Sequence, residues 1–348
     1  MKRAEVTRTK VAVFDTKSYD RRFLEQANVQ YQHHLTFFEA QLEPTTAVLA
    51  EGFPAICVFV NDQIGKAVLA QLAAQGTKIV ALRCAGYNNV DLAEAGKLGI
   101  IIVRVPAYSP HAVAEFTIGL ALALDRHIHR AWARVRENNF ALDGLIGRNL
   151  FGRTVGVIGT GRIGALVART FKLGFGCDVI ACDLVPDDDL VAAGVRYVER
   201  GELIARADII TLHCPLTPDT RHIINASSIE AAKPGVKIIN TSRGALIDTK
   251  ALIDGLKSHK IGGVALDVYE QEADLFFKDL SSEIIDDDVF QRLLTFPNVL
   301  VTGHQAFLTE EALTAIAETT LQNIADALAG RPLSNRIGAE FSVPAAHL

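Results

Sequence analysis

The stretch Thr154–Gly164, TVGVIGTGRIG, decides the fold. A β-branched run leads into Gly159, Gly161 and Gly164, and a helix-forming segment follows from Ala165 to Leu173. Glycines at this spacing let the backbone turn tightly and approach a pyrophosphate, which then lies at the amides of the helix N-terminus. A GxGxxG pattern alone is weak evidence, but a strand before it and a helix after it predict a dinucleotide-binding βαβ unit.

Asp183 follows the next apolar run, which is the second strand of the same predicted unit. A carboxylate at this place binds the adenosine ribose hydroxyls of a dinucleotide and repels an additional 2′-phosphate. The next residues are Leu184, Val185 and Pro186, followed by three aspartates, so the segment offers no cation to that phosphate. The sequence therefore predicts NAD as the cofactor and not NADP.

The alternation of short β-branched runs with helical stretches extends over the whole chain. Apolar runs separated by helices are typical of parallel βαβ units. Two series of predicted strands are Lys10–Asp15, Ala55–Val60, Lys78–Arg83 and Ile100–Val103, then Thr154–Ile158, Asp178–Cys182, Asp208–His213, Lys237–Thr241, Gly263–Asp267 and Val299–Thr302. The pattern predicts an α/β protein with two Rossmann-like, doubly wound parallel-sheet domains.

The segment Val105–Pro110, VPAYSP, separates the two series. Its prolines and Ser109 predict a hinge followed by a helix start, with Ser109 as the cap. The helix is predicted to reach about Asn138, and its apolar part, Glu115–Arg130, predicts burial between domains or in a subunit interface. A second long helix, Glu310–Leu328, is expected to pack back on the first domain.

Composition excludes several classes of protein. Of the 348 residues 49% are hydrophobic and 22% are charged, and the net charge of −5 argues against binding to nucleic acid. The five cysteines are scattered and form no CxxC pair, so neither disulfides nor a metal site are predicted. No signal peptide is recognisable, and the longest apolar stretch, Phe116–Leu124, is shorter than the ~20 residues of a membrane span. We expect a cytoplasmic protein without membrane partners.

Three polar residues lie beyond predicted strands of the second series, Arg243 after VKIINTS, Glu272 after GVALDVY and His304 after VLVTG. Parallel strands end at the ligand-binding edge of an open sheet. A guanidinium can hold a carboxylate in a bidentate fork, an imidazolium can donate a proton, and a carboxylate beside an imidazole orients the ring. This set suits reduction of a 2-oxo acid. The spacing leaves open a surface salt bridge for Arg243, a cap for His304 and a solvated side chain for Glu272.

Five longer motifs occur in order along the chain: VIGTGRIG, HCPLTPDTRHIIN, KPGVKIINTSRGALID, GVALDVYEQE and VTGHQAF. In these motifs, and over nearly its whole length, the chain resembles the D-isomer-specific 2-hydroxyacid dehydrogenase family. The resemblance implies an NAD-binding domain of residues 108–303 inserted in a substrate domain of residues 1–107 and 304–348, with an active-site cleft between the two domains. It also implies a homodimer or a homotetramer.

The resemblance assigns roles to matching positions. It implies that Arg243 binds the substrate, that His304 is the catalytic acid and base, and that Glu272 pairs with His304. The substrate-binding residues that it implies are Ala85 and Gly86, through their amides, with Tyr108 and Phe307. The cofactor-binding residues that it implies are Gly159, Gly161, Arg162, Ile163, Gly164, Asp183, Cys214, Pro215, Thr241, Ser242 and, near the nicotinamide, Asp267.

The stretch LFFKDLSSEIIDDDVF and the tripeptide TGH ending at His304 are similar to the lactate branch of the family. This likeness implies reversible reduction of pyruvate to D-lactate by NADH, in a small pocket near Tyr108 and Phe307. Glyoxylate, hydroxypyruvate and larger 2-oxo acids stay open as substrates, because loops shape the pocket. A non-catalytic, NADH-sensing protein resembling a corepressor is a further alternative, and it is expected to turn over no 2-oxo acid.

Overall fold

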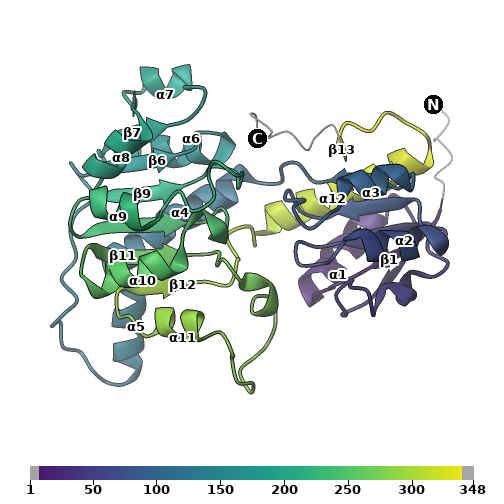
Figure 1. Cartoon of the computed structure of the whole chain (residues 1–348), viewed down its shortest axis with the longest axis horizontal. Helices are drawn as coiled ribbons and strands as arrows, with labels where there is room; N and C mark the ends of the chain where they lie inside the picture. Colours follow the sequence, from purple (N-terminus) through teal and green to yellow (C-terminus); the bar gives the residue numbers. More distant parts are fainter. Residues whose placement is uncertain (1–7, 339–348) are drawn as a thin grey trace. The chain divides into compact units, whose positions relative to one another are not determined.

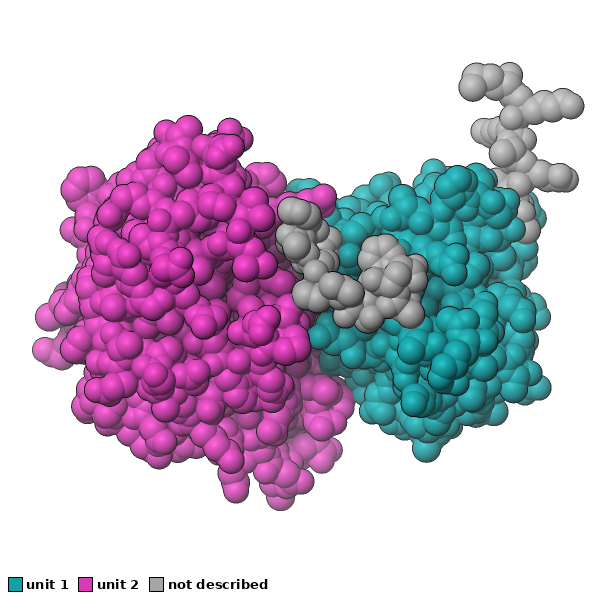
Figure 2. Space-filling model, turned by 45° about the horizontal axis from the view of Figure 1, so that its top comes forward, with its two compact units in different colours: residues 1–109, 308–345 teal, residues 110–307, 346–348 magenta. Residues whose placement is uncertain are grey.

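The computed structural model describes residues 8–338 and divides them into two compact units (Figures 1 and 2). Unit 1 holds the described residues up to Ser109 and those from Leu308 onward, and unit 2 runs from Pro110 to Phe307. The chain therefore leaves unit 1 once and returns to it. Relative to the predicted boundaries, Tyr108 lies in unit 1 and His304 in unit 2, where its backbone N–H donates to the Asp267 carbonyl.

Unit 1 is built on a six-stranded sheet with the order β13-β5-β4-β3-β1-β2. Strands β1 to β5 are parallel, and β13 is antiparallel to β5. The strands are β1 (Lys10–Val13), β2 (His34–Phe37), β3 (Ala55–Val58), β4 (Ile79–Leu82), β5 (Ile101–Arg104) and β13 (Arg336–Ile337). The sequence did not predict β2, because this edge strand is only half-buried and lacks an apolar run.

The helices of unit 1 include the second long helix expected from the sequence. They are α1 (Ser18–Asn28), the 3-10 turn η1 (Ala47–Ala50), α2 (Lys66–Ala74), α3 (Leu92–Lys97) and α12 (Glu310–Leu328). Helix α12 packs on α1, β4 and β5 and belongs to unit 1. The Thr309 side chain caps α12 by accepting from the Ala312 N–H at 3.2 Å.

Unit 2 is built on a seven-stranded parallel sheet with the order β12-β11-β10-β9-β6-β7-β8. The strands are β6 (Thr154–Ile158), β7 (Asp178–Cys182), β8 (Arg196–Tyr197), β9 (Ile209–Leu212), β10 (Val236–Asn240), β11 (Ile261–Leu266) and β12 (Val299–Val301). The strand order reverses between β6 and β9, and ligands of such sheets bind beyond the strand ends at this point. The predicted Rossmann-like architecture of both units is confirmed.

Helices cover both faces of the unit 2 sheet (Figure 1). They are α4 (Pro110–Asp125), α5 (Ile128–Arg136), α6 (Arg162–Arg169) continued by the π-helical turn η2 (Thr170–Gly174), α7 (Asp188–Ala192), α8 (Arg200–Arg206), α9 (Ala226–Ala231), the 3-10 turn η3 (Gly244–Leu246), α10 (Thr249–Lys257), the 3-10 turn η4 (Glu272–Asp274) and α11 (Asp288–Leu294). Side chains alternate along each strand. Val155 and Val157 join a core with α4 and α6, whereas Ile158 and Ile210 join a core with α8 and α10.

The predicted helix that reaches Asn138 is wrong in its second half. Helix α4 starts at Pro110 as expected but ends at Asp125, and His127 takes a left-handed conformation with φ 53° before α5 begins. Helix α4 packs on α6 and strands β10 to β12, so its apolar residues belong to the core of unit 2. Its burial between domains or in a subunit interface stays a prediction. Helix α5 has no buried residue.

Between residues 8 and 338, no helix combines the length and the apolar character that crossing a membrane requires. The same residues contain no group of three or more histidine, cysteine, aspartate or glutamate side chains arranged to hold a metal ion. The five cysteines are free.

Candidate active site

The glycine turn after β6 requires residues without a side chain. Gly159 has φ +90°, and a Cβ on it would lie 2.5 Å from the Cys214 nitrogen. A Cβ on Gly164 would lie 1.9 Å from the Gly159 oxygen. Helix α6 starts at Arg162, and its N-cap residue, Gly161, has no side chain that could bond to the amides of the first turn. The backbone at this helix N-terminus therefore fits a pyrophosphate.

Loops after β9 and β10 lie beside this turn. The Ser242 hydroxyl donates to the Cys214 carbonyl at 2.8 Å, and Cys214 itself contacts Gly159. Thr241 is buried, with its hydroxyl 2.8 Å from that of Thr117 in α4. The structure thus gathers Gly159, Cys214, Thr241 and Ser242 at one edge of the sheet, where the sequence placed the cofactor.

Asp183, just after β7, is held by the residue that follows Gly159. One carboxylate oxygen accepts the Thr160 N–H at 2.5 Å and the Thr160 hydroxyl at 3.1 Å, and the other accepts the Leu184 N–H at 2.6 Å. Tyr197 of β8 donates its hydroxyl to Thr160 at 2.9 Å. No described lysine or arginine forms an ion pair with Asp183. This acid fits ribose hydroxyls better than a 2′-phosphate.

His304 and Glu272 form a half-buried pair. The His304 Nδ1 atom lies 2.7 Å from Glu272 Oε1, and both side chains are 17% exposed. The other oxygen of Glu272 accepts the Tyr269 N–H at 2.9 Å. Because Nδ1 is engaged by the carboxylate, Nε2 is the nitrogen left for a substrate, and no described residue hydrogen-bonds to it. His304 has φ 53°, a conformation that costs energy for a non-glycine residue and often marks a functional site.

Asp267 holds the loop that carries His304. Its side chain is fully buried and accepts from the Thr302 hydroxyl at 2.6 Å, the Gln305 N–H at 2.9 Å and the Ala306 N–H at 2.8 Å. Burial raises the pKa of the Asp267 carboxyl above its ordinary value, although the three donors act against this. The structure therefore shows Asp267 positioning His304, whereas its contact with a nicotinamide stays a prediction.

Arg243 follows β10 on a loop that is fixed at its backbone. The Asn240 side-chain amide donates to the Arg243 carbonyl at 2.8 Å. A Cβ on the next residue, Gly244, would lie 2.0 Å from the Tyr269 carbonyl carbon, so this loop packs against the segment that leads to Glu272. The guanidinium donates to the Ser242 carbonyl at 2.7 Å and pairs with no described carboxylate, which leaves it able to bind an anion.

A second histidine–glutamate pair lies nearby, and no feature of the sequence alone assigns it a role. His222 Nε2 lies 2.6 Å from Glu270 Oε1. Arg221 approaches the same oxygen at 3.4 Å, and the Thr249 hydroxyl donates to Oε2 at 3.3 Å. Both residues stood in quoted motifs, HCPLTPDTRHIIN and GVALDVYEQE, so the sequence contained the signal but not the pairing.

The other predicted substrate residues lie partly in unit 1. Ala85 and Gly86 follow β4, and the Ala85 carbonyl accepts from Arg104 of β5 at 2.7 Å. Tyr108 is half-buried within unit 1. Phe307 is buried and belongs to unit 2.

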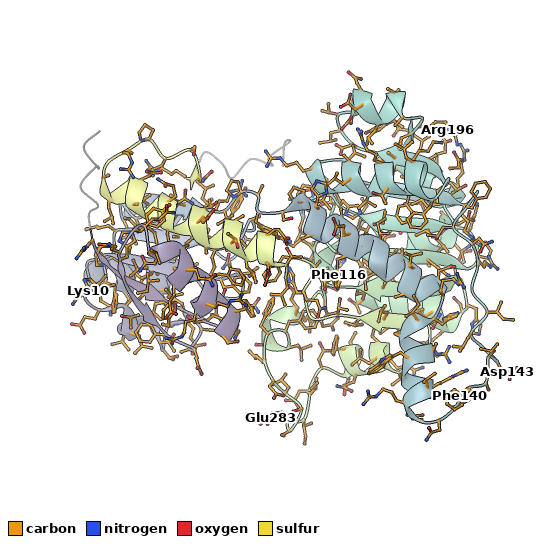
Figure 3. All side chains as sticks on the ribbon, turned by 180° about the vertical axis from the view of Figure 1, so that it is seen from behind. Lys10, Phe116, Phe140, Asp143, Arg196 and Glu283 are labelled. Carbon is orange, nitrogen blue, oxygen red and sulfur yellow. The ribbon has the colours of Figure 1, made fainter. Side chains whose placement is uncertain are left out.

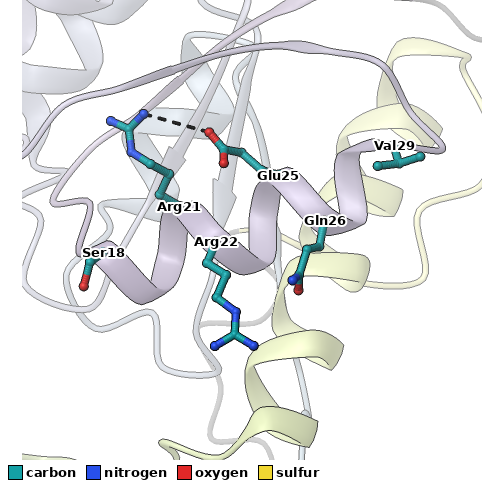
Figure 4. A pocket seen from close by; sticks show the side chains of 6 residues that line it. All are labelled: Ser18, Arg21, Arg22, Glu25, Gln26 and Val29. Atoms are coloured by element: carbon teal, nitrogen blue, oxygen red, sulfur yellow. Dashed lines mark ion pairs between the residues drawn. The ribbon is translucent and has the colours of Figure 1, made fainter.

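A hollow elsewhere in unit 1 offers no comparable chemistry. Its lining consists of α1 side chains and one residue after α1, namely Ser18, Arg21, Arg22, Glu25, Gln26 and Val29 (Figure 4). Arg21 pairs with Glu25 at 3.9 Å, and Arg22 pairs with Glu310 of α12 at 3.6 Å. The cations of this hollow are therefore neutralised by neighbours.

The glycine turn, the acid after β7 and the His304–Glu272 pair are the features expected of an oxidoreductase that uses a dinucleotide. The family model for the NAD-binding domain of D-isomer specific 2-hydroxyacid dehydrogenases matches residues 118–306. The chain belongs to this family and is a D-2-hydroxyacid dehydrogenase.

Three similar proteins cover nearly the whole chain. A 2-hydroxyacid dehydrogenase homolog of Haemophilus influenzae is 56% identical and matches 94% of this chain and 98% of its own. The D-lactate dehydrogenase of Escherichia coli is 51% identical, over 94% of this chain and 99% of its own. The solved structure of the pyruvate reductase of Chlamydomonas reinhardtii superposes with a TM-score of 0.90 at 46% identity, over 95% of this chain and 99% of that one.

Proposed function

We propose that the protein is an NAD-dependent D-lactate dehydrogenase that reduces pyruvate to D-lactate reversibly. The His304–Glu272 pair, with Nδ1 and Oε1 2.7 Å apart, carries this proposal because it leaves one ring nitrogen for a substrate oxygen. The unpaired guanidinium of Arg243 supplies the charge that a 2-oxo acid requires. The similar proteins named for D-lactate and pyruvate support this choice of substrate.

The cofactor is NAD in this proposal. Gly159, Gly161 and Gly164, with Arg162 and Ile163 at the start of α6, hold the pyrophosphate, and Asp183 binds the ribose hydroxyls. Cys214, Pro215, Thr241 and Ser242 line the remaining part of the site. When bound, NADH supplies the hydride that the substrate C2 receives.

The side chains of unit 2 carry out the acid–base step. Arg243 binds the substrate carboxylate in a bidentate fork. Protonated His304 donates the proton on Nε2 to the carbonyl oxygen, which becomes the hydroxyl of lactate, while Glu272 stabilises the imidazolium. In the reverse direction neutral His304 accepts that proton. Asp267 keeps the ring in place through the amides of its loop.

Four further residues contribute to substrate binding and specificity in this proposal. Ala85 and Gly86 bind the carboxylate through their amides, and Tyr108 and Phe307 limit the space at the methyl group.

The test measures the initial rate of NADH oxidation with pyruvate, glyoxylate, hydroxypyruvate, phenylpyruvate and a branched 2-oxo acid. NADPH serves as the cofactor control, and chiral analysis identifies the product. The proposal expects the highest kcat/KM with pyruvate and NADH, and D-lactate as the product. Preference for a larger acid would replace the substrate and keep the catalytic residues. Absence of turnover with every acid, together with binding of NADH, would favour the sensor.

We further propose that the protein works as a homodimer or a homotetramer. Helix α5 and the segment after it expose large apolar side chains, among them Trp132, Phe140 and Ile146, the last 90% exposed. Figure 3 shows Phe140 and Asp143 in the loop that follows α5. Large apolar side chains that a monomer exposes together favour burial against a second copy of the chain. Sedimentation equilibrium measures the mass directly, and a monomer at micromolar concentration would overturn the proposal.

A further inference from the structure

Two buried arginines end neighbouring strands of unit 1, and they differ in their partners. Arg83, just after β4, is 1% exposed and pairs with Asp20 at 3.2 Å. Arg104, the last residue of β5, is 8% exposed and forms an ion pair with no carboxylate among residues 8–338. A buried cation without a counter-ion is costly to keep. Among the described residues, other groups stabilise the guanidinium of Arg104.

The Arg104 guanidinium is fixed in one place. It donates through Nη1 to the Ala85 carbonyl at 2.7 Å and lies over the Tyr87 ring, 5.1 Å from the centroid. The backbone of Arg104 is fixed as well, because its carbonyl accepts from Asn323 of α12 at 2.8 Å and its N–H donates to Asn335 at 3.1 Å. Burial lowers the pKa of Arg104 from its ordinary value, yet a guanidinium stays charged at neutral pH.

The bonded carbonyl belongs to the same peptide group as the Gly86 N–H. A charged donor on the oxygen of a peptide group polarises that group, and its N–H becomes a stronger donor. The Gly86 N–H is a donor that the proposed function assigns to the substrate carboxylate. The cation at Arg104 would therefore act on the substrate through one peptide bond, without touching it.

We propose that Arg104 is a positioning residue that orients and polarises the Ala85–Gly86 peptide for binding the carboxylate of the 2-oxo acid. The proposal rests on the proposed function, because it takes the Gly86 amide as a substrate ligand. Binding of this kind is the same in the ground state and the transition state, so it acts on KM and not on kcat.

The experiment compares steady-state kinetics of the wild type with Arg104→Met, which keeps much of the stem and removes the cation. We expect KM for pyruvate to rise roughly 10-fold, as for loss of a hydrogen bond to a charged group, with kcat changed less than about 3-fold. The Kd of NADH is expected to stay unchanged. Oxamate, an unreactive pyruvate analogue, should bind the NADH complex more weakly by the same factor as the KM change.

Arg104→Lys decides the question if the methionine variant does not fold. A lysine keeps the charge but cannot both stack on Tyr87 and reach the Ala85 carbonyl in fork geometry, so we expect a KM increase of about 3-fold. Arg22→Met is the matched control, since Arg22 is an exposed arginine of unit 1 that pairs with Glu310. It should leave KM unchanged.

The outcomes separate this inference from the proposed function. A wild type that reduces pyruvate, with Arg104 variants that lose thermal stability but keep KM and oxamate affinity, overturns the role of Arg104 and leaves the proposed function intact. A wild type that reduces no 2-oxo acid overturns both. An increase of KM shared by Arg22→Met also overturns the role, because the effect would then follow from charge alone.

Discussion

Glu270 and Glu272 are two residues apart, and each bonds a histidine from a distant part of the chain. Glu272 lies 2.7 Å from His304, and Glu270 lies 2.6 Å from His222. Residue types and distances are nearly the same in the two pairs, although His222 is 32% exposed and His304 17%. The other contacts of each pair differ, and these contacts separate a pair able to catalyse from one that holds the fold.

The Glu270 carboxylate is shared among several side chains. It has Arg221 and Thr249 as neighbours, at 3.4 Å and 3.3 Å, and His222 is bonded to it through Nε2, the nitrogen farther from the backbone. The His222 N–H donates to the Ala245 carbonyl on the loop after Arg243. This pair therefore ties that loop to the segment leading to Glu272.

In the Glu272 pair, the outer ring nitrogen of the histidine has no hydrogen-bond partner among the described residues. This histidine is bonded through Nδ1, so Nε2 points away from the carboxylate, and the second oxygen of Glu272 is satisfied by the Tyr269 N–H. The His304 loop is held separately by Asp267. A reactive imidazole requires a fixed ring and a nitrogen that can reach the substrate. The nitrogen that the glutamate leaves over is Nε2, at the outer end of the ring, in His304 but Nδ1, beside the backbone, in His222.

The largest expected effect tests this distinction directly. His304→Asn should lower kcat by roughly 10³-fold, since it removes the acid and base, and should leave the Kd of NADH within about 3-fold. His222→Asn is the matched variant and should lower kcat less than about 10-fold, because its role is to fix a loop. Equal losses of kcat in the two variants, measured with pyruvate at saturation, would remove the distinction between the pairs.

Arg243 and Arg221 differ in their partners, because only Arg221 approaches a described carboxylate. Arg243→Lys should reduce kcat/KM for pyruvate by about 10²-fold, because a point charge cannot form the bidentate fork with a carboxylate. Arg221 is 56% exposed and contacts Glu270, so Arg221→Lys should change kcat/KM less than about 3-fold. An Arg243→Lys enzyme with the kcat/KM of the wild type would reject Arg243 as the carboxylate ligand.

Removing the charge from each carboxylate gives a smaller contrast. Glu272→Gln keeps the shape but no longer stabilises the imidazolium, and we expect kcat to fall about 30-fold. Glu270→Gln should cost about 3-fold in kcat and appear mainly as a lower Tm, since its amide retains part of the hydrogen bonding. Circular dichroism melts alongside the kinetics separate the two effects. A larger loss of kcat in Glu270→Gln would reverse the roles.

Local features of the fold could be predicted from the sequence. The glycine turn depends on residues within one βα unit, so the spacing of Gly159 and Gly164, together with the strand before them and the helix after them, predicts it. The apolar runs of β6 and β10 likewise determine their own burial. Strand β2 was missed because its half-buried residues carry no such run. The helix break at His127 was missed because Ile128 and Trp132 continue an apolar pattern although they are exposed.

Contacts between distant residues could not be predicted from spacing. Nothing local shows that Glu272 meets His304 while Glu270 meets His222, and the first pairing entered only through the family resemblance. Arg104 ends an apolar run, so the sequence predicts a strand end at this residue. It does not predict that the guanidinium bonds to the Ala85 carbonyl. Which donors surround a carboxylate depends on how loops from several strands pack.

His213, also in unit 2, differs from His304 and His222 because no described carboxylate pairs with it. His213 follows β9, packs against Gly164 and has its Nε2 atom 2.7 Å from the Thr211 hydroxyl. Burial lowers the pKa of His213 to about 3. As the pH falls, His213 therefore takes up a proton near pH 6.5 in the unfolded chain but only near pH 3 in the folded chain.

The stability contribution of His213 is therefore fully present above about pH 6.5 and is lost as the pH falls toward about 3. The slope is at most about 1.4 kcal/mol per pH unit for one proton. Urea unfolding between these limits should show a shallower slope for His213→Gln than for the wild type. Thr211→Val keeps the burial and removes the hydrogen bond, so it should retain the wild-type slope. If Thr211→Val flattens the slope as much as His213→Gln does, the hydrogen bond and not burial keeps this histidine neutral.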